Sequence, residues 1–411
     1  MSNILFIWPP KIEYIFSIQK HYTNFGETIA YLEENGCNVD VMDGSALLHF
    51  QWDFIQAYSK KYEYLIVYTD LHNAMSAIKA AQLCKKISPT TIIISYGQGA
   101  SYVPETLIEN GFDAVVIDPM YQKTIMDYIK YIEDNNYRTE LRGIYFKEGG
   151  KLTKIEKRNV LDVSKVAFPA LSKIPVKQYK QISGRDQVCF TVARGCPYPC
   201  HFCRVPMDQG KKVSYRPIPD IVDYVKEVKD NFKSIKFIAP TFTVDREWVL
   251  NLCESILSSG VQSKWIVTTR LELLDKELLD MMSRAGCIAI AFGLETLYSE
   301  TQKSIDKNLP VDFVTSQVNL LHSSGIIPKA FIMLGIPGQT AKEIEDTYMY
   351  LRNNNIEVRP KEYYPYDELL STDDQLGLLR RFEREDVYNT PIPEVSPSRF
   401  VDWLSDRTTV R

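Results

Sequence analysis

Several features that would assign a chain to a special class are missing from this sequence. No uninterrupted apolar run is long enough to span a bilayer. The segment from Met1 to Pro10 has no basic stretch before its apolar residues, which argues against a signal peptide. The net charge is only -4, which gives no reason to expect a nucleic-acid partner. We therefore expect a cytoplasmic protein that binds neither nucleic acid nor membrane.

Internal repeats, low-complexity tracts and a disulfide framework are missing as well. The eight cysteines are too few and too irregularly spaced in 411 residues to form such a framework. Three of them fall within eight residues of one another, which in a cytosolic protein points to a metal site. The other five stand singly in apolar or helical stretches, and we interpret them as buried reduced thiols: Cys37, Cys84, Cys189, Cys253 and Cys287.

What the sequence does contain, over its first 135 residues, is an alternation of short apolar runs with helix-length segments. Turn signals such as Asn35-Gly36 and Asn110-Gly111 punctuate the series. Five successive βα units predict an α/β fold with a doubly wound, Rossmann-like parallel sheet, because parallel strands need crossover connections. Ligands of such sheets bind beyond the carboxyl ends of the strands. The predicted strands are Ile4–Trp8, Asn38–Met42, Tyr64–Thr69, Thr91–Ser95 and Asp113–Ile117.

A second βα series follows a predicted hairpin at Gly143–Lys151 and an aperiodic linker at Asp162–Lys180. Its strand candidates lie roughly 25–50 residues apart, which leaves room for one helix each, as in a full or partial βα barrel. We predict a sheet domain at 1–140, a hairpin and linker at 141–182, a partial (β/α)6 barrel at 183–340 and a helical or irregular region capping the barrel at 341–411. The strand candidates are Gln187–Val192, Ile235–Ala239, Lys264–Thr269, Ile288–Phe292, Ala330–Leu334 and Ile356–Val358.

The cysteine cluster has the spacing C-x3-C-x2-C, formed by Cys196, Cys200 and Cys203. It directly follows the first strand of the second series, where barrel enzymes place their chemistry. A structural zinc site needs four ligands, and no Cys or His pair elsewhere supplies a convincing fourth. His201 falls inside the loop and would point away if the three thiolates converge. Three thiolates on a 4Fe–4S cluster leave one iron open for another ligand.

The cysteine spacing, with Phe202 before the last cysteine, resembles the signature of the radical S-adenosylmethionine (SAM) superfamily. That resemblance implies a 4Fe–4S cluster on the three cysteines, SAM on the open iron, and one-electron cleavage of SAM to methionine and a 5′-deoxyadenosyl radical. Four later stretches are similar to other motifs of the superfamily: Tyr215–Val222, Trp265–Gly286, Ala291–Thr296 and Phe331–Thr340.

The same resemblance implies which residues contact SAM. Arg270 matches a position that often contacts the SAM carboxylate, and Glu295 one near its polar groups. Gly335 belongs to the motif near the adenine, and Phe202 is the aromatic residue of the cluster loop. The second strand departs from the pattern: it ends Ile238-Ala239-Pro240-Thr241, where many relatives carry a Gly-rich or acidic motif that holds the SAM amino group.

A doubly wound domain before such a barrel resembles the cobalamin-binding radical SAM class. The similar stretches are Trp8–Pro10, Ala30–Asp43 and Ser95–Gly99. Gly97 and Gly99 would let the backbone approach a broad corrin ring without a Cβ clash. The resemblance places the corrin beyond the carboxyl ends of the strands, facing the barrel mouth, in contact with Pro9, Thr69, Tyr96, Gly97, Gln98 and Gly99.

Two features depart from the cobalamin-binding pattern. The D-x-H-x-x-G motif that supplies a lower axial histidine is absent after the first strand; Asp70-Leu71-His72 follows the third strand instead, and we interpret it as a coincidence. Asp118-Pro119 stands where a G-E-x-E ending is usual. Many radical SAM relatives bind cobalamin without the histidine, so the motif's absence leaves cobalamin binding open.

The resemblance implies a cobalamin-dependent methyltransferase that acts on an unactivated carbon or phosphorus of a small-molecule substrate. An electron donor such as flavodoxin or ferredoxin would supply the reducing electron. Two alternatives stay open: a radical SAM cyclase, rearrangement or oxidation enzyme that does not use its cobalamin-type domain for methyl transfer, and a non-catalytic cobalamin or cluster sensor. The sequence assigns no acid or base and no substrate. Aromatic residues at Glu362–Asp367 and Arg399–Trp403 would either cap the barrel mouth or anchor a C-terminal tail.

Overall fold

The computed structural model describes residues 2–9, 18–47, 51–58, 61–158, 162–363 and 373–383. The chain forms two compact units: Met1–Thr191 with Asp367–Arg384, and Val192–Tyr366 with Glu385–Arg411. Of the aromatic stretches noted near the C-terminus, Tyr364–Asp367 and Arg399–Trp403 lie outside the described residues. In the described part of the chain, no helix is both long and apolar enough to cross a membrane.

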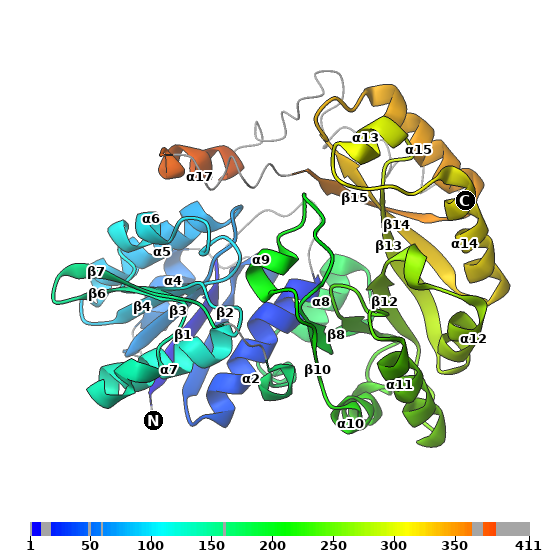
Figure 1. The fold of residues 1–411 in the computed structure, drawn as a ribbon. Helices are drawn as coiled ribbons and strands as arrows, with labels where there is room; N and C mark the ends of the chain where they lie inside the picture. Colours follow the sequence, from blue (N-terminus) through cyan, green and yellow to red (C-terminus); the bar gives the residue numbers. More distant parts are fainter. Residues whose placement is uncertain are drawn as a thin grey trace. The chain divides into compact units, whose positions relative to one another are not determined.

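The first unit is built on a seven-stranded sheet with the strand order β2-β1-β3-β4-β5-β6-β7 (Figure 1). The first five strands are parallel, which confirms the predicted doubly wound α/β sheet. All five residues of β3, the middle one of the five parallel strands, are buried, as expected for a parallel strand covered on both faces. The strands are β1 (Asn3–Trp8), β2 (Asn38–Asp43), β3 (Tyr64–Tyr68), β4 (Ile92–Tyr96), β5 (Ala114–Val116), β6 (Ile144–Glu148) and β7 (Lys151–Ile155).

The hairpin predicted at Gly143–Lys151 is present, but it is part of this sheet. Strand β6 pairs antiparallel with β5, and β7 pairs antiparallel with β6. The first three residues of β6 are buried, and its Phe146 ring packs edge-on against Tyr128 and Tyr131 of helix α7 (Tyr121–Glu133). The hairpin thus extends the sheet, and the aromatic residues of α7 cover one face of the hairpin.

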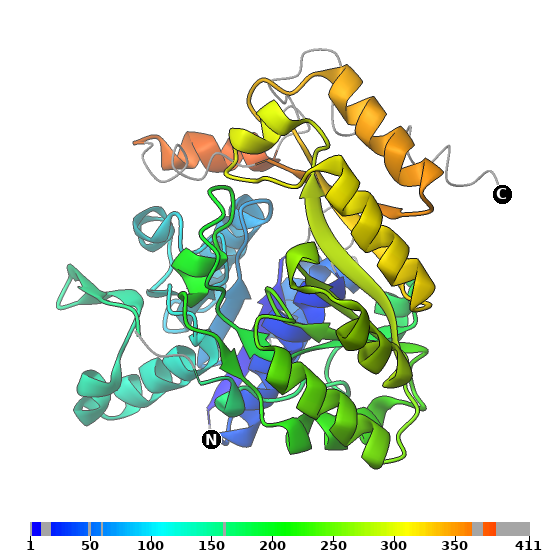
Figure 2. The ribbon, with the colours of Figure 1, turned by 45° about the vertical axis from the view of Figure 1, so that its right-hand side comes forward.

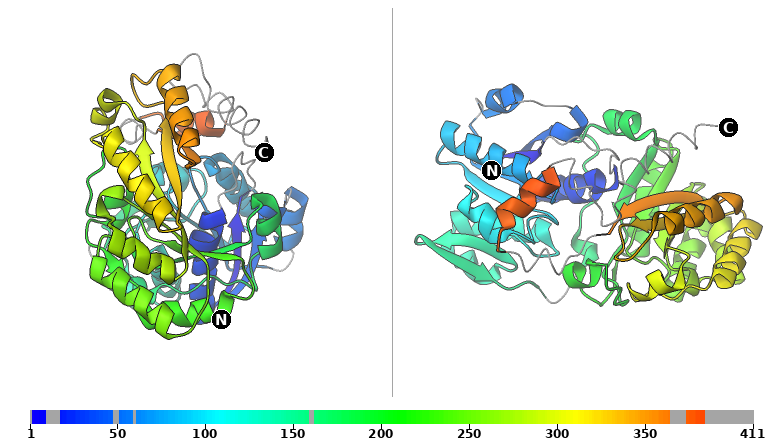
Figure 3. Two further views of the ribbon diagram at one scale, coloured as in Figure 1. Left: turned by 90° about the vertical axis from the view of Figure 1, so that its right-hand side faces the viewer. Right: turned by 90° about the horizontal axis from the view of Figure 1, so that it is seen from above.

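Helices and short helical turns connect the strands of the first unit. The segment between β1 and β2 includes a six-residue π-helix, η1, a form that is rare and often found at functional sites. The last helix, α17, comes from the far end of the chain and packs against α5 (Figure 3). The remaining elements are α1 (Ile18–Lys20), η1 (His21–Gly26), α2 (Glu27–Glu34), α3 (Gly44–Leu47), α4 (Gln51–Tyr58), α5 (Ala74–Ile87), α6 (Pro104–Glu109), η2 (Asn135–Glu140), η3 (Val163–Lys165), α8 (Val176–Ser183) and α17 (Gln375–Glu383).

The second unit contains strands β11 to β15 of a curled six-stranded sheet with the order β15-β14-β13-β12-β11-β8; strand β8 belongs to the segment of the first unit that ends at Thr191. Neighbouring strands β11 to β15 pair in parallel, and each crossover contains at least one α-helix. This arrangement matches the predicted partial barrel. The strands are β8 (Gln187–Thr191), β11 (Ser234–Ile238), β12 (Trp265–Thr269), β13 (Cys287–Glu295), β14 (Ile327–Leu334) and β15 (Glu357–Glu362); β9 (Ala193–Arg194) and β10 (Ser214–Tyr215) form a separate pair.

The crossover helices of the second unit begin at well-defined caps. The carboxylates of Asp245 and Asp275 accept backbone N–H groups at the starts of α11 and α12, and Thr340 forms a capping box with Glu343 at the start of α15. Successive helices pack against one another along the outer side of the curled sheet (Figure 2). The helices are α9 (Val205–Gln209), α10 (Ile218–Val228), α11 (Arg246–Ser258), η4 (Leu271–Leu273), α12 (Lys276–Arg284), α13 (Ser299–Lys303), α14 (Val311–Ser323) and α15 (Ala341–Asn353).

Candidate functional site

The three clustered cysteines lie on one loop between β9 and α9. The start of this loop is held by two hydrogen bonds: Gly195 N donates to Gln209 Oε1 at 3.1 Å, and Cys196 N donates to Gly210 O at 3.1 Å. Inside the loop, Cys203 N donates to Cys200 O at 3.0 Å. The antiparallel pairing of β9 with β10 holds the strand that leads into the loop. The backbone around the thiols is thus fixed by contacts that use none of the sulfur atoms.

The cysteine side chains share one environment. Cys196 is buried, and Cys200 and Cys203 are half-buried, whereas His201 is exposed. Burial raises the pKa of the Cys203 thiol to about 11, and the nearby Cys200 and Cys196 act in the same direction. Within the described ranges, no three His, Cys, Asp or Glu side chains are grouped to hold a single metal ion. An iron–sulfur cluster takes one thiolate per iron, so its ligands do not have to converge on one point. Three neighbouring thiols on a fixed loop fit such a cluster.

Arg270 follows strand β12 and reaches the cysteine loop. Its guanidinium lies 4.3 Å from the centroid of the Tyr198 ring, and its Nη1 donates a hydrogen bond to Cys200 Sγ at 3.4 Å. Its Nη2 donates to Glu272 Oε1 at 2.5 Å. The structure therefore brings this predicted site residue to the thiols. Its predicted contact with the SAM carboxylate stays a prediction.

Glu295 ends strand β13 and is buried together with a lysine. Lys307 Nζ lies 3.1 Å from Glu295 Oε1 and donates to Gly293 O at 2.6 Å. A Cβ atom at position 293 would lie 2.3 Å from Glu295 Oε1, so a side chain there would displace the pair. Burial raises the pKa of the Glu295 carboxyl, while Lys307 and Arg270 pull it down. Sequence reasoning missed Lys307, although a carboxylate predicted at a buried strand end needs a cation near it.

The loop after β14 contacts the cysteine loop through an apolar cluster. Phe202 and Tyr363 pack against buried Ile305, Met333 and Ile336. The Gln339 side chain fixes this loop: its Oε1 accepts Gly335 N at 3.0 Å, and its Nε2 donates to Met333 O at 3.0 Å. The predicted residues Phe202 and Gly335 are therefore brought to one region of the second unit. The motif glutamine gives the loop its shape.

The residues predicted to contact a corrin gather at the carboxyl ends of the first unit's strands. The strand order reverses between β1 and β3, which makes that edge the expected ligand position. Thr69 N donates to Tyr96 O at 2.7 Å, and Gly99 N donates to Thr69 O at 3.0 Å, so the loops after β3 and β4 are joined. Pro9, Thr69 and Tyr96 are buried, whereas Gly97 and Gln98 are half-exposed. Gly97 and Gln98 are thus the most accessible of the predicted contacts.

The two glycines in this region have a packing role that the sequence analysis did not expect. A Cβ at Gly97 would lie 2.6 Å from Thr69 O, and a Cβ at Gly99 would lie 2.2 Å from the carbonyl carbon of Asp70. Gly97 also has a φ of +118°, which disfavours other residues. The expected reason for these glycines was room for a planar ligand. The structure shows a different reason: the backbone of the neighbouring loop leaves no room for a Cβ atom.

Asp70-Leu71-His72 proves to be a helix entry. Asp70 Oδ1 accepts the backbone N–H groups of His72 at 2.9 Å and Asn73 at 3.0 Å, directly before α5. The Asp70 side chain thus stabilises the turn that leads into α5, which is a structural reason for its place beside Leu71 and His72. Asp118, the other departure, forms an ion pair with Arg158 at 3.0 Å and is fully buried in its side chain.

A buried polar network at the same edge of the sheet escaped the sequence analysis. The His21 ring of η1 stacks on Trp8 at a centroid distance of 3.8 Å, and its Nδ1 lies 2.7 Å from Asp43 Oδ2. Tyr179 donates its hydroxyl to the same carboxylate oxygen at 2.5 Å. In the described part of the chain, the buried Trp8 Nε1 and Ser45 Oγ have no hydrogen-bond partner. Two buried donors thus remain at the ends of β1 and β2, beside the predicted ligand position.

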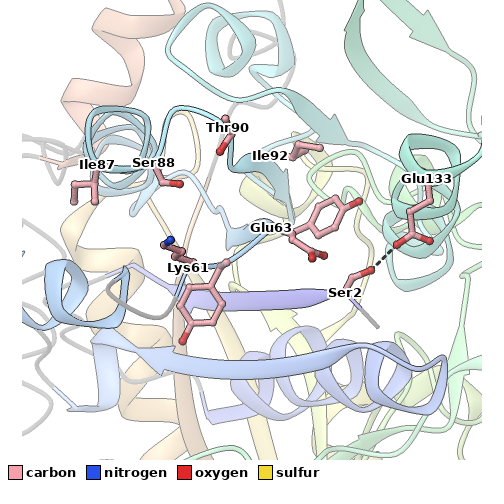
Figure 4. Close-up of a pocket in the computed structure, with 10 residues that line it drawn as sticks. Ser2, Lys61, Glu63, Ile87, Ser88, Thr90, Ile92 and Glu133 are labelled. Atoms are coloured by element: carbon pink, nitrogen blue, oxygen red, sulfur yellow. Dashed lines mark hydrogen bonds between the residues drawn. The ribbon is translucent and has the colours of Figure 1, made fainter.

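A pocket of the first unit lies at the opposite, amino end of the strands (Figure 4). It is lined by residues such as Ser2, Glu63 and Glu133, and Ser2 Oγ donates to Glu133 Oε1 at 2.6 Å. No predicted site residue lines this pocket.

Comparisons with known proteins bear on both units. Residues 190–351 match the model of the radical SAM superfamily. The chain is 22% identical over 288 residues to an uncharacterized methyltransferase of Pyrococcus horikoshii, covering 68% of this chain and 62% of the relative. It is 21% identical over 335 residues to the anaerobic magnesium-protoporphyrin IX monomethyl ester cyclase of Rubrivivax gelatinosus, covering 78% of this chain and 60% of the relative. The chain thus spans about six tenths of the length of these relatives.

A solved structure shows a similar overall fold. It is the radical SAM methyltransferase TsrM from Kitasatospora setae with cobalamin and a [4Fe-4S] cluster bound; the TM-score is 0.69 at 14% identity, covering 87% of this chain and 75% of that chain. That likeness concerns the fold, whereas the family match concerns the segment with the three cysteines. Residues 190–351 thus match the radical SAM superfamily, and the fold of the chain is similar to that of a radical SAM methyltransferase solved with cobalamin and a [4Fe-4S] cluster.

Proposed function

We propose that this protein is a cobalamin-dependent radical SAM methyltransferase that acts on a small molecule. The observation that carries the proposal is the loop with Cys196, Cys200 and Cys203, three neighbouring thiols on a backbone fixed by other contacts. The family match of the segment that contains this loop supports it. When bound, the cluster supplies the electron that cleaves SAM, and the corrin carries the methyl group.

The chain's own residues would divide the work as follows. The three thiolates hold the cluster. Arg270 and the Glu295–Lys307 pair offer opposite charges to the polar groups of SAM, while Phe202 and the Gly335 loop offer an apolar surface to its adenine. Charged groups with low exposure suit this task, because their interactions are only weakly screened by water and salt.

The first unit would hold the corrin at the carboxyl ends of its strands. The proposed contacts are Pro9, Thr69 and Tyr96–Gly99. Two observations support a ligand there: the reversal of strand order between β1 and β3, and the buried donors Trp8 Nε1 and Ser45 Oγ without partners in the described residues. The amide-rich rim of a corrin offers acceptors to such donors. A flavodoxin or ferredoxin is proposed as the electron donor, and the cytoplasm as the location.

A cyclase is the second candidate function. The likeness to the anaerobic magnesium-protoporphyrin IX monomethyl ester cyclase favours it over other radical reactions. The two candidates share the cluster and SAM and differ in whether a methyl group reaches the product.

The test is anaerobic reconstitution with iron, sulfide and hydroxocobalamin, followed by desalting and absorption spectroscopy. We expect both iron–sulfur and corrin absorption, and 5′-deoxyadenosine after addition of SAM and reductant. Changing Cys196, Cys200 and Cys203 together to Ala should remove the cluster and this product. The matched controls Cys84→Ala and Cys253→Ala, buried thiols outside the loop, should keep both. A triple variant with a full cluster would refute the assignment of the thiols. Wild-type protein that retains no corrin would refute the cobalamin part.

A further inference from the structure

Each of the three cysteine sulfur atoms has a hydrogen-bonding partner of its own. Arg270 Nη1 donates to Cys200 Sγ at 3.4 Å, and the backbone N–H of Val205 reaches Cys203. The third partner is a side chain from the loop after β11: Thr241 Oγ1 lies 3.4 Å from Cys196 Sγ. In the free thiol either atom can donate this hydrogen bond. A sulfur that ligates iron has lost its proton, so the hydroxyl of Thr241 must then be the donor.

Thr241 is held firmly in this position. It follows β11, and both Thr241 and Cys196 are buried, with exposed fractions of 6% and 7%. The next residue, Phe242, donates its backbone N–H to Thr268 O at 2.9 Å. The Phe242 ring packs against Phe237, Trp248 and Trp265, at centroid distances between 5.7 and 6.2 Å. The anchored neighbour keeps the Thr241 hydroxyl at the sulfur, and burial limits its replacement by water.

We infer that Thr241 is a positioning residue that raises the reduction potential of the cluster by donating its hydroxyl hydrogen to the Cys196 sulfur. The inference rests on the proposed cluster. Thr241 lies in the loop after the second barrel strand. At this position many relatives carry a Gly-rich or acidic motif that holds the SAM amino group, and this sequence lacks that motif.

Reduction adds one electron to the cluster and makes its sulfur atoms more negative. A hydroxyl hydrogen pointing at one of these atoms stabilises the reduced state more than the oxidised state, and hydrogen bonds to the sulfur atoms are among the factors that set cluster potentials. The effect is stronger in a buried site than in water because screening is weaker. Without the hydroxyl, the cluster should be harder to reduce.

The test compares four proteins loaded anaerobically with iron and sulfide. Thr241→Val removes the hydroxyl and keeps the shape, whereas Thr241→Ser keeps the hydroxyl. The matched control is Thr243→Val, because the buried Thr243 hydroxyl contacts Thr269 Oγ1 at 2.5 Å and, among the residues that the structure describes, forms no hydrogen bond with a sulfur atom. Each cluster is titrated with titanium(III) citrate, which gives up the electron, and the reduced fraction is read by electron paramagnetic resonance.

We expect Thr241→Ser and Thr243→Val to have the wild-type midpoint potential and Thr241→Val to have a lower one. At the wild-type midpoint, the ratio of reduced to oxidised cluster in Thr241→Val should fall severalfold; a tenfold fall corresponds to about 59 mV for a one-electron couple. If Thr241→Val does not load a cluster, Thr241→Ala removes the same hydroxyl without the branched side chain and carries the comparison.

Two results would overturn the inference. One is a wild-type midpoint in the variants that lack the hydroxyl. The other is a Thr241→Ser cluster shifted as far as that of Thr241→Val, which would assign the shift to packing. Either result leaves the wild-type cluster in place and so leaves the proposed function standing. A wild-type protein that loads no cluster would overturn both proposals.

Discussion

Replacing Lys307 by methionine would leave the Glu295 carboxylate without its nearest cation. The two side chains are only 8% and 6% exposed, so water cannot take the place of the ammonium group. Breaking a buried ion pair by removing one partner costs about 3–5 kcal/mol. We expect Lys307→Met to lower the free energy of unfolding by an amount in this range. The measurement is urea unfolding of the unloaded protein at pH 8, followed by circular dichroism.

Lys303→Met is the matched control. This lysine lies four residues earlier and pairs with Glu300 at 2.6 Å, but the side chains are 67% and 83% exposed. Exposed pairs contribute little to stability, so the control should unfold almost as the wild type does. Adding Glu295→Gln to Lys307→Met should recover part of the loss, because it removes the unpaired charge. A Lys307→Met variant no less stable than Lys303→Met would refute the reasoning.

The same variant should show a pH dependence of known sign. Burial raises the pKa of Glu295 in the folded protein, and Lys307 opposes that rise. Without Lys307 the folded-state pKa rises further above the unfolded value of about 4.3. Below that unfolded value the carboxyl is protonated in both states, and the penalty vanishes. As the pH increases, the unfolded chain ionises first, so stability falls until the folded-state pKa is passed. The loss caused by Lys307→Met should therefore be larger at pH 8 than at pH 5.

Two further predictions concern the first unit. Gly99→Ala places a Cβ 2.2 Å from the Asp70 carbonyl carbon; we expect a loss of about 1–3 kcal/mol or more from overpacking, measured by urea unfolding, together with weaker corrin retention after desalting. A fully stable variant that retains corrin would contradict this. Tyr179→Phe removes a hydroxyl that donates to buried Asp43 at 2.5 Å; a hydrogen bond to a charged group contributes about 1.5–3 kcal/mol, so the same assay should show a loss of that size, and an unchanged unfolding midpoint would argue against the network.

The sequence was sufficient to predict the strands that are buried on both faces. Strands such as β3 and β4 are continuous apolar runs bounded by turn residues, and their ends were predicted to within about one residue. The sheet membership of β6 was missed, because it depends on α7, whose Tyr128 and Tyr131 cover Phe146. No pattern within the hairpin itself carries that information.

In the candidate site too, residues defined by a local sequence pattern were predicted, and residues defined by contacts between distant segments were not. The cysteines could be predicted as cluster ligands because all three fall within one loop. Lys307 and Thr241 could not be predicted, because each acts on a residue distant in the chain: Lys307 on Glu295, and Thr241 on Cys196, 45 residues away. The strand exit at Thr241 was noticed only as a departure from a motif. Its hydroxyl becomes meaningful when the fold brings the loop after β11 to the sulfur.

Helix α17 has a consequence for how the first unit forms during synthesis. Its Leu379 is fully buried, Gln375 accepts a hydrogen bond from Thr106 at 2.7 Å, and the helix packs on α5. The main part of the unit ends at Thr191, so the ribosome adds about 180 residues before this helix exists. At 5–20 residues per second that takes roughly 10–40 s. During that interval the α5 surface stays open to water and to chaperones, and a fragment cut after Thr191 would keep that surface exposed permanently.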